Sequence, residues 1–274
     1  MSQERVTLDV KDGVADVRMA RPDKMNAIDG AMFSALAEVG DQVAADKGIR
    51  AVVLSGEGRA FCAGLDFKSF MAMGNRDPKE AAREPAPDLL ATAGESPANR
   101  AQRAGWVWQE VPVPVIAAVH GVAYGGGLQI ALGADIRIVA PDAKLSVMEI
   151  KWGLVPDMSG TQTLRRLVRL DVAKELTFTG RVVSGEEAVE IGLATRVSED
   201  PRAAALELAG EIASKSPDAI RSSKRLLNES GLGTVREGLG LEATLQRALV
   251  GSPNQLEAVM SNLEKRAPRF KDPE

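Results

Sequence analysis

Two carboxylates in apolar surroundings are the clearest candidates for proton-transfer chemistry in this sequence. Glu149 lies between Met148 and Ile150, and Asp157 follows Pro156 eight positions later. Neighbours of this kind desolvate a carboxyl group, which raises its pKa and makes it a better acid or base near neutral pH. Each residue alone also fits a structural role, Asp157 as a helix cap and Glu149 as a solvated strand end.

Two glycine-rich segments lie where an expected strand meets an expected helix. Residues 56–66 follow an apolar strand, and Gly125-Gly126-Gly127 leads into an apolar helix. A helix N-terminus offers unpaired N–H groups and the positive end of a dipole, which can stabilise a developing oxyanion. Glycine equally allows an ordinary turn or close helix–strand packing. Both segments are therefore candidates for binding a ligand through the backbone.

Scarce residue types exclude several classes of enzyme. Cys62 is the only cysteine, so the chain has no internal disulfide or paired-cysteine zinc site, and a reducing compartment is expected. His120 is the only histidine, which excludes H-E-x-x-H metal sites; we expect it to be a structural hydrogen-bonding residue. The G-x-S-x-G motif of serine hydrolases and the G-x-x-x-x-G-K-[ST] phosphate loop are both missing.

Composition indicates an ordinary globular protein. The 274 residues are 45% hydrophobic and 26% charged, which suits one or two domains. With 34 basic and 38 acidic residues the net charge is -4, so no general attraction to nucleic acid or anionic membranes is expected. No apolar run approaches the roughly 20 residues of a membrane helix, and no signal peptide is evident. We expect a cytoplasmic protein.

Hydrophobic periodicity predicts alternating helices and strands, typical of the α/β class. The predicted elements are a hairpin over 6–19, helices over 31–45, 101–109 and from 128, and strands over 51–54, 115–119 and 136–139. A segment rich in proline, alanine and charge between Gly74 and Pro97 is expected to be a mobile surface loop or lid.

The C-terminal quarter is predicted to be helical only. The expected helices cover 203–214, 217–228, 235–250 and 253–265. We therefore predict a core over residues 1–200 and an appended helical module over 201–274. Lys224-Arg225 is expected on a solvated helix face.

Taken together, the motifs resemble the crotonase (enoyl-CoA hydratase/isomerase) superfamily over almost the whole chain. The matching stretches are Arg21-Pro22 through Asn26-Ala27, residues 60–66 (A-F-C-A-G-L-D), Gly125-Gly126-Gly127 and Gly160-Thr161-Gln162, in the family's order. The resemblance implies a spiral of ββα units with a C-terminal helical oligomerisation module. It also implies a homo-oligomer, either a trimer or a dimer of trimers.

The resemblance implies that the substrate is an acyl-CoA thioester, so that coenzyme A is part of the substrate, and that no metal or redox cofactor is involved. The oxyanion hole of the family maps to the backbone N–H groups of Leu65 and Gly126, which would stabilise a thioester enolate. The residues that the resemblance assigns to CoA binding are Lys24, Met25, Arg59, Ala63 and Asp66, with Phe270 and Lys271 reaching a neighbouring subunit's CoA.

The catalytic acids match the family only in part. Of the two glutamates of enoyl-CoA hydratases, the second maps to Glu149 but the first maps to Gln129. Dienoyl-CoA isomerases use a glutamate and an aspartate that map to Glu149 and Asp157, although their additional acid also falls at Gln129. Because a glutamine amide cannot exchange a proton near neutral pH, isomerisation of enoyl-CoA or dienoyl-CoA double bonds is the preferred prediction. The alternatives are hydration of a 2-enoyl-CoA by Glu149 and a noncatalytic acyl-CoA-binding relative.

Overall fold

The computed structural model describes residues 4–68, 71, 88–92 and 96–273. Its larger sheet has the strand order β1-β2-β3-β4-β6-β9. Strands β1 (Val6–Lys11) and β2 (Val14–Met19) form the predicted hairpin, with Val6 opposite Met19. The remaining pairs are parallel. They add β3 (Ala51–Gly56), β4 (Val115–Val119), β6 (Ile136–Val139) and β9 (Arg196–Val197).

Helices cover both faces of the larger sheet, which explains why β3 and β4 are apolar apart from Ser55. Helices α1 (Gly30–Ala45) and α4 (Arg100–Glu110) pack against each other on one face. Helix α9 (Pro201–Ala213) covers the other face, where Ala205 and Ala209 are buried against β3, β4 and β6. Every residue of β3 and β4 is buried as a result.

The region that follows β4 is built of short elements. A second sheet has the order β5-β7-β8 and contains β5 (Val122–Tyr124), β7 (Lys144–Ser146) and β8 (Val183–Ser184). The helices here are α5 (Gly126–Gly133), η2 (Glu149–Trp152), α6 (Gly160–Leu167), α7 (Leu170–Thr179) and α8 (Gly185–Glu190). A short 3-10 helix, η1 (Pro22–Lys24), follows the hairpin.

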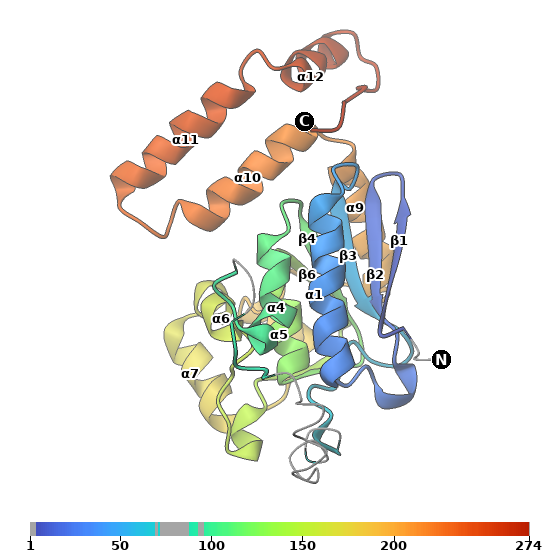
Figure 1. Cartoon of the computed structure of the whole chain (residues 1–274), viewed down its shortest axis with the longest axis vertical. Coiled ribbons are helices and arrows are strands. Elements are labelled where there is room, and N and C mark those ends of the chain that lie inside the picture. The colour runs from blue at the N-terminus through green and yellow to red at the C-terminus, as the bar shows by residue number, and fades with distance from the viewer. Residues whose placement is uncertain (1–3, 69–70, 72–87, 93–95, 274) are drawn as a thin grey trace.

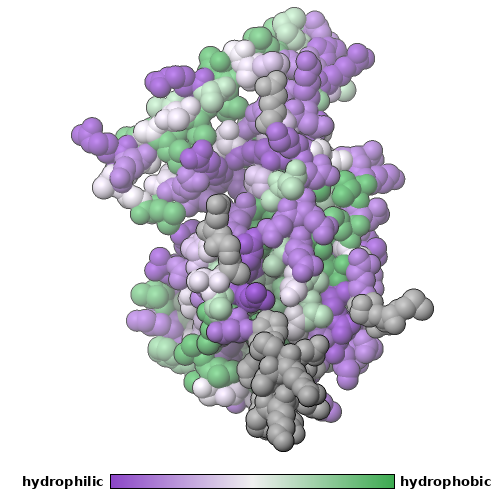
Figure 2. Space-filling view, in the orientation of Figure 1, coloured by the Kyte–Doolittle hydropathy of each residue, from purple (hydrophilic) through white to green (hydrophobic). Residues whose placement is uncertain are grey.

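Three further helices extend away from the sheets at one end of the molecule (Figure 1). They are α10 (Pro217–Glu229), α11 (Val235–Leu249) and α12 (Pro253–Leu263). Figure 2 shows apolar and polar side chains interspersed over this end of the molecule. Leu232, Val235 and Leu239 are among its exposed apolar residues. The predicted boundary at residue 201 places α9 with these helices, whereas α9 itself packs on the sheet.

Most predicted elements are confirmed to within a few residues. The predicted loop between Gly74 and Pro97 lies outside the described residues except for 88–92 and 96–97. The carboxyl ends of β3 and β4 lead into the two glycine-rich segments, and isolated bridges join Ile28 to Leu65 and Cys62 to Ala123. These bridges bring the N-terminal motif, residues 60–66 and the start of α5 to one place.

Candidate active site

A cavity of about 240 Å³ lies where these segments meet, and it contains both predicted acids. Its wall is mainly apolar, with few polar groups, as expected for a small-molecule site. The cavity brings together Leu65, Gly126, Glu149 and Asp157 from four separate segments. Its other lining residues are Phe33, Ala63, Gly64, Phe67, Leu89, Leu90, Ala101, Tyr124, Gly125, Met148, Trp152, Leu154 and Met158.

Leu65 lines this cavity, next to a backbone bridge with Ile28. The Ile28 N–H donates to Gly64 O at 2.8 Å, and the Asp66 N–H donates to Ile28 O at 2.9 Å. In such a parallel bridge the groups flanking Leu65 are used, and its own N–H points the other way. Gly64 has φ +88°, and a Cβ there would lie 2.6 Å from Tyr124 O, so this close approach requires glycine.

The N-terminus of α5 lies beside this loop. Gly125 precedes the helix with φ 50° and ψ -119°, a conformation that favours glycine. Gly126 is the first helical residue, and the N–H groups of a first turn have no partner within the helix. A Cβ placed on Gly64 would lie 3.8 Å from Gly126 N, so the two loops are in contact distance. Two backbone donors thus border the same cavity.

Glu149 is buried and held by one amide. Gln129 Nε2 donates to Glu149 Oε1 at 2.6 Å, and Glu149 Oε2 is buried without a partner among the described residues. Burial raises the pKa of Glu149 above its ordinary value, and hydrogen bonds, including that from Gln129, partly oppose this rise. A Cβ on Gly125 would lie 3.3 Å from Glu149 Oε1, which places this carboxylate next to the N-terminus of α5.

The orientation of the Gln129 amide is set by the backbone. Its Oε1 accepts hydrogen bonds from Met158 N at 2.9 Å and from Gly160 N at 3.0 Å. Only the NH₂ group can therefore face Glu149. Gln129 is 2% exposed and contacts the segment immediately after Asp157 as well as Glu149. The sequence predicted Gln129 as a lining residue, at the position of the first hydratase glutamate. Among the described residues it does not line the cavity itself, and it contacts Glu149 and the segment after Asp157 instead.

Asp157 lies at the solvent-facing mouth of the cavity, before α6. The surrounding protein partly desolvates its carboxyl group and raises its pKa above the ordinary value. Its charge in turn raises the pKa of Glu149, so the two carboxylates interact electrostatically. The alternative role as an N-cap is not seen, because the N-cap of α6 is Ser159.

Aromatic side chains form one wall of the cavity. The rings of Phe67 and Trp152 are 4.1 Å apart at an interplanar angle of 34°. Trp152 is half-exposed, with its ring 5.7 Å from Lys151 Nζ. Trp108, by contrast, is buried in the core and donates to Ala104 O. Trp108 therefore packs in the core, whereas Trp152 lines the cavity.

The residues predicted to bind CoA fall into two groups. Ala63 N donates to Met25 O at 2.9 Å, so the η1 turn and the glycine-rich loop lie side by side, with Lys24 and Arg59 exposed. Asp66 forms an ion pair with Arg21 at 2.9 Å.

Phe270 and Lys271 are held elsewhere. Arg50 at the start of β3 donates to Phe270 O at 3.2 Å, and Lys271 N donates to Asn254 Oδ1 on α12 at 2.9 Å. They therefore lie by the amino end of β3, whereas the cavity follows its carboxyl end.

The remaining single-residue predictions have mixed outcomes. His120 is a structural residue, with Nε2 2.9 Å from Gly58 O. Cys62 is buried, and burial raises the pKa of its thiol to about 12, which leaves the thiol unreactive.

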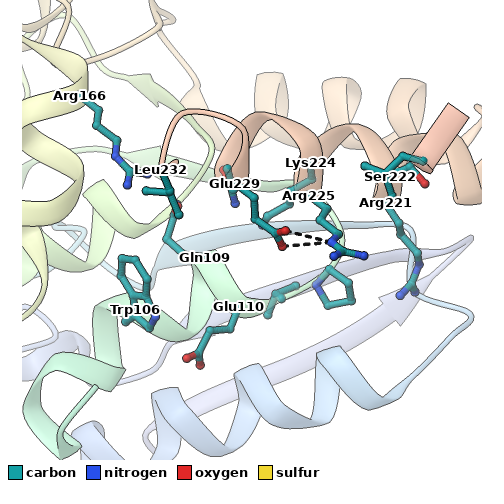
Figure 3. A pocket seen from close by; sticks show the side chains of 14 residues that line it. Trp106, Gln109, Glu110, Arg166, Arg221, Ser222, Lys224, Arg225, Glu229 and Leu232 are labelled. Carbon is teal, nitrogen blue, oxygen red and sulfur yellow. Dashed lines mark hydrogen bonds and ion pairs between the residues drawn. The ribbon is translucent and has the colours of Figure 1, made fainter. Parts of the chain in front are cut away.

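The expectation of a solvated face at Lys224 is wrong. Lys224 Nζ lies 2.8 Å from Asp135 Oδ2 and donates to Trp108 O and Val113 O. Its partners lie far away in sequence, so helical periodicity does not reveal them. Burial lowers the pKa of Lys224. Figure 3 shows Lys224 in the wall of a second cavity beside α10, where its neighbour Arg225 pairs with Glu229 at 3.1 Å and is exposed as predicted.

Asn26 of the N-terminal motif has a structural role that the sequence did not reveal. Asn26 Nδ2 donates to the carbonyls of Glu57, Ala60 and Phe61, and its Oδ1 accepts from Arg21 N. Because Asn26 is fully buried, these bonds fix the glycine-rich loop from its buried side.

No helix in the described part of the chain is long and apolar enough to cross a membrane.

Comparison with known proteins agrees with this arrangement. Residues 9–273 match the enoyl-CoA hydratase/isomerase family. A probable enoyl-CoA hydratase of Bacillus subtilis (strain 168) is 35% identical over 97% of this chain and 98% of that protein. The mitochondrial Delta(3,5)-Delta(2,4)-dienoyl-CoA isomerase of Mus musculus is 34% identical over 92% of this chain and 77% of that protein.

A solved structure gives the same result for the fold. The crystal structure of a putative enoyl-CoA hydratase from Streptomyces coelicolor A3(2) superposes with a TM-score of 0.85 and 30% identity, covering 99% of this chain and 96% of that one. The fold is therefore the predicted crotonase fold, and the chain belongs to the enoyl-CoA hydratase/isomerase family of the crotonase superfamily.

Proposed function

We propose that this protein isomerises carbon–carbon double bonds of enoyl-CoA or dienoyl-CoA thioesters, using Glu149 and Asp157 as proton carriers. Leu65 and Gly126 hold the thioester oxygen through their backbone N–H groups. Lys24, Met25, Arg59, Ala63 and Asp66 line the path of the CoA moiety.

The oxyanion hole supplies the electrostatic part of catalysis. Removing a proton next to a thioester carbonyl moves charge onto its oxygen. Donors already in place at that oxygen need no reorganisation, and each is worth about 3 kcal/mol of barrier in comparable enzymes. The backbone N–H groups of Leu65 and Gly126 border the cavity from two different loops, which supports this role.

The two carboxylates divide the proton transfers. Glu149 lies next to the start of α5, where the thioester carbonyl would bind, so its Oε2 takes a proton from C2. The resulting enolate is conjugated with the remaining double bonds, and Asp157 returns a proton at the far end of that system. Asp157 must start protonated for this step, and its exposed position lets it recover a proton from water.

The observation that carries the choice of isomerisation is the bonding of Gln129. Its Oε1 is occupied by Met158 N and Gly160 N, and its Nε2 donates to Glu149. It therefore provides no carboxylate to activate a water molecule. A hydratase working through Glu149 alone remains the second candidate, since Glu149 lines the cavity and its Oε2 has no partner among the described residues. A noncatalytic acyl-CoA-binding protein is the third.

The test is to incubate the protein with 2-enoyl-CoA, 3-enoyl-CoA and 3,5-dienoyl-CoA and to follow mass and ultraviolet absorbance. Isomerisation leaves the mass unchanged and shifts the absorbance of the dienoyl or enoyl group. A gain of one water would assign the chain as a hydratase and refute the proposal. Tight binding of every ester without any product would indicate the noncatalytic alternative.

We further propose that the protein works as a homo-oligomer, a trimer or a dimer of trimers, in the cytoplasm. In this arrangement Phe270 and Lys271, which lie away from their own cavity, reach the CoA of a neighbouring subunit. The molar mass in solution, measured by light scattering, tests the oligomer. A monomer would overturn this part of the proposal.

A further inference from the structure

Arg21 holds both sides of the bridge that presents Leu65. Its Nη1 donates to Ala27 O at 2.9 Å and lies 2.9 Å from Asp66 Oδ2. Ala27 directly precedes Ile28, and Asp66 directly follows Leu65, so one guanidinium connects the two segments of the Ile28–Leu65 bridge. Arg21 and Asp66 side chains are only 11% and 13% exposed, which shields this pair from solvent.

A second ion pair anchors the same guanidinium. Asp29 Oδ2 lies 3.6 Å from Arg21 Nη1 and accepts from Arg5 Nη2 at 2.8 Å. Asp29 is also the N-cap of α1, where its side chain accepts from Met32 N. Arg21 therefore cannot shift without disturbing a capped helix, and the network fixes it to a rigid element.

We propose that Arg21 is a positioning residue for the oxyanion hole. Through Asp66 and Ala27, it fixes the direction of the Leu65 N–H toward the thioester oxygen. This inference rests on the role proposed above for Leu65. It also assigns Asp66 a function independent of CoA: its carboxylate transmits the position of Arg21 to the loop.

The reasoning follows from how a backbone donor works. Leu65 N–H is held pointing away from Ile28 while Gly64 O and Asp66 N both bond to Ile28. The loop carries a left-handed Gly64, whose backbone has many other accessible conformations once the bridge loosens. A donor that is displaced or mobile loses much of its electrostatic benefit in the transition state, because preorganisation is the source of that benefit.

The experiment uses Arg21→Met, with Arg5→Gln as the matched control. Arg5 pairs with Asp29 at 2.8 Å, so Arg5→Gln removes a neighbouring ion pair while the Arg21–Asp66 ion pair and the Arg21–Ala27 hydrogen bond stay in place. Butyryl-CoA labelled with ¹³C at the thioester carbonyl is bound to each variant, and the carbonyl stretching frequency is measured by infrared difference spectroscopy. Saturated butyryl-CoA requires no proton transfer, so the measurement is independent of the acids.

The wild type and Arg5→Gln are expected to lower the carbonyl frequency relative to free butyryl-CoA. Arg21→Met should show a smaller shift, a kcat reduced by about tenfold or more and a KM close to that of the wild type. An Arg21→Met protein with the carbonyl shift and kcat of the control would overturn the inference.

Two further outcomes are separated by design. If Arg21→Met fails to fold, Asp66→Asn removes the same ion pair while keeping the side-chain volume, and the same loss of carbonyl shift is expected. An unchanged shift in folded Asp66→Asn would overturn the inference. If even the wild type leaves the carbonyl frequency of bound butyryl-CoA unchanged, the oxyanion hole itself is wrong, which is a failure of the proposed function.

Discussion

Replacing Gln129 with glutamate tests the hydrogen bond that distinguishes this site from a two-glutamate site. The backbone N–H groups of Met158 and Gly160 would hold one oxygen of the new carboxylate, as they hold Oε1 of the amide. The other oxygen would then take the place of Nε2, which lies 2.6 Å from Glu149 Oε1. Two acceptors would face each other where a donor now faces an acceptor.

The size of the effect follows from that distance. At 2.6 Å and an effective dielectric constant of about 20, two carboxylates repel each other by about 6 kcal/mol. Keeping one of them protonated at pH 7 costs about 4 kcal/mol from an ordinary glutamate pKa. The repulsion is larger, so the pair should retain one proton at pH 7. The surplus of about 2 kcal/mol favours the singly protonated pair over the doubly ionised pair by about 30-fold at pH 7. The Met158 and Gly160 N–H groups stabilise the ionised form of the new carboxylate, so the proton should lie on Glu149 and kcat/KM should fall at that pH.

The assay is the pH dependence of kcat/KM for isomerisation in the wild type, Gln129→Glu and Gln129→Met. In the wild type, the raised pKa of Glu149 places the acid limb above the ordinary glutamate value, because activity falls when this base is protonated. The acid limb of the kcat/KM profile should move to higher pH in Gln129→Glu. It should move by less in Gln129→Met, which removes the hydrogen bond to Glu149 without adding a charge. A folded Gln129→Glu protein with the wild-type pH profile would refute the contact between residue 129 and Glu149.

Three further changes test the two acids of the site and the buried Lys224–Asp135 ion pair. Asp157→Asn should abolish isomerisation and leave CoA-ester affinity intact in a binding titration; normal turnover would contradict the role of Asp157. Glu149→Gln should be inactive yet more stable than the wild type by about 1 kcal/mol in urea at pH 7. The folded pKa of Glu149 is raised, so its charge lowers stability as pH rises, and the gain should vanish at pH values below the unfolded-state pKa. Lys224→Met should cost about 3 kcal/mol of unfolding free energy because it leaves the Asp135 carboxylate without its cation; a loss within error of zero would contradict the buried pair.

The sequence predicts the parts of the fold that have strong periodic patterns. The 6–19 hairpin alternates about a two-residue turn, and α1 repeats apolar residues at helical spacing, so local rules suffice for both. Strands β8 and β9 have two residues each and carry no such pattern. Their positions depend on pairing with distant strands, which periodicity does not reveal.

The sequence predicted which residues form the cavity, but not the hydrogen bonds between them. The family resemblance assigned Leu65 and Gly126, the apolar neighbours of the two acids pointed to Glu149 and Asp157, and the cavity brings all four together. The amide of Gln129 forms bonds across 20 and 29 positions of sequence. Such contacts follow from tertiary packing, and a list of residue types does not contain them.

The most direct test of the central claim, two carboxylates sharing the proton transfers, is isomerisation of 3,5-dienoyl-CoA in D₂O. The product is isolated early in the reaction and its deuterium located by NMR and mass spectrometry. The account predicts one deuterium at C6, delivered by Asp157, while the proton that Glu149 removes from C2 is lost to solvent. A product without deuterium would mean that a single group carries the proton across, and a product heavier by one water would mean hydration; either result would contradict the account.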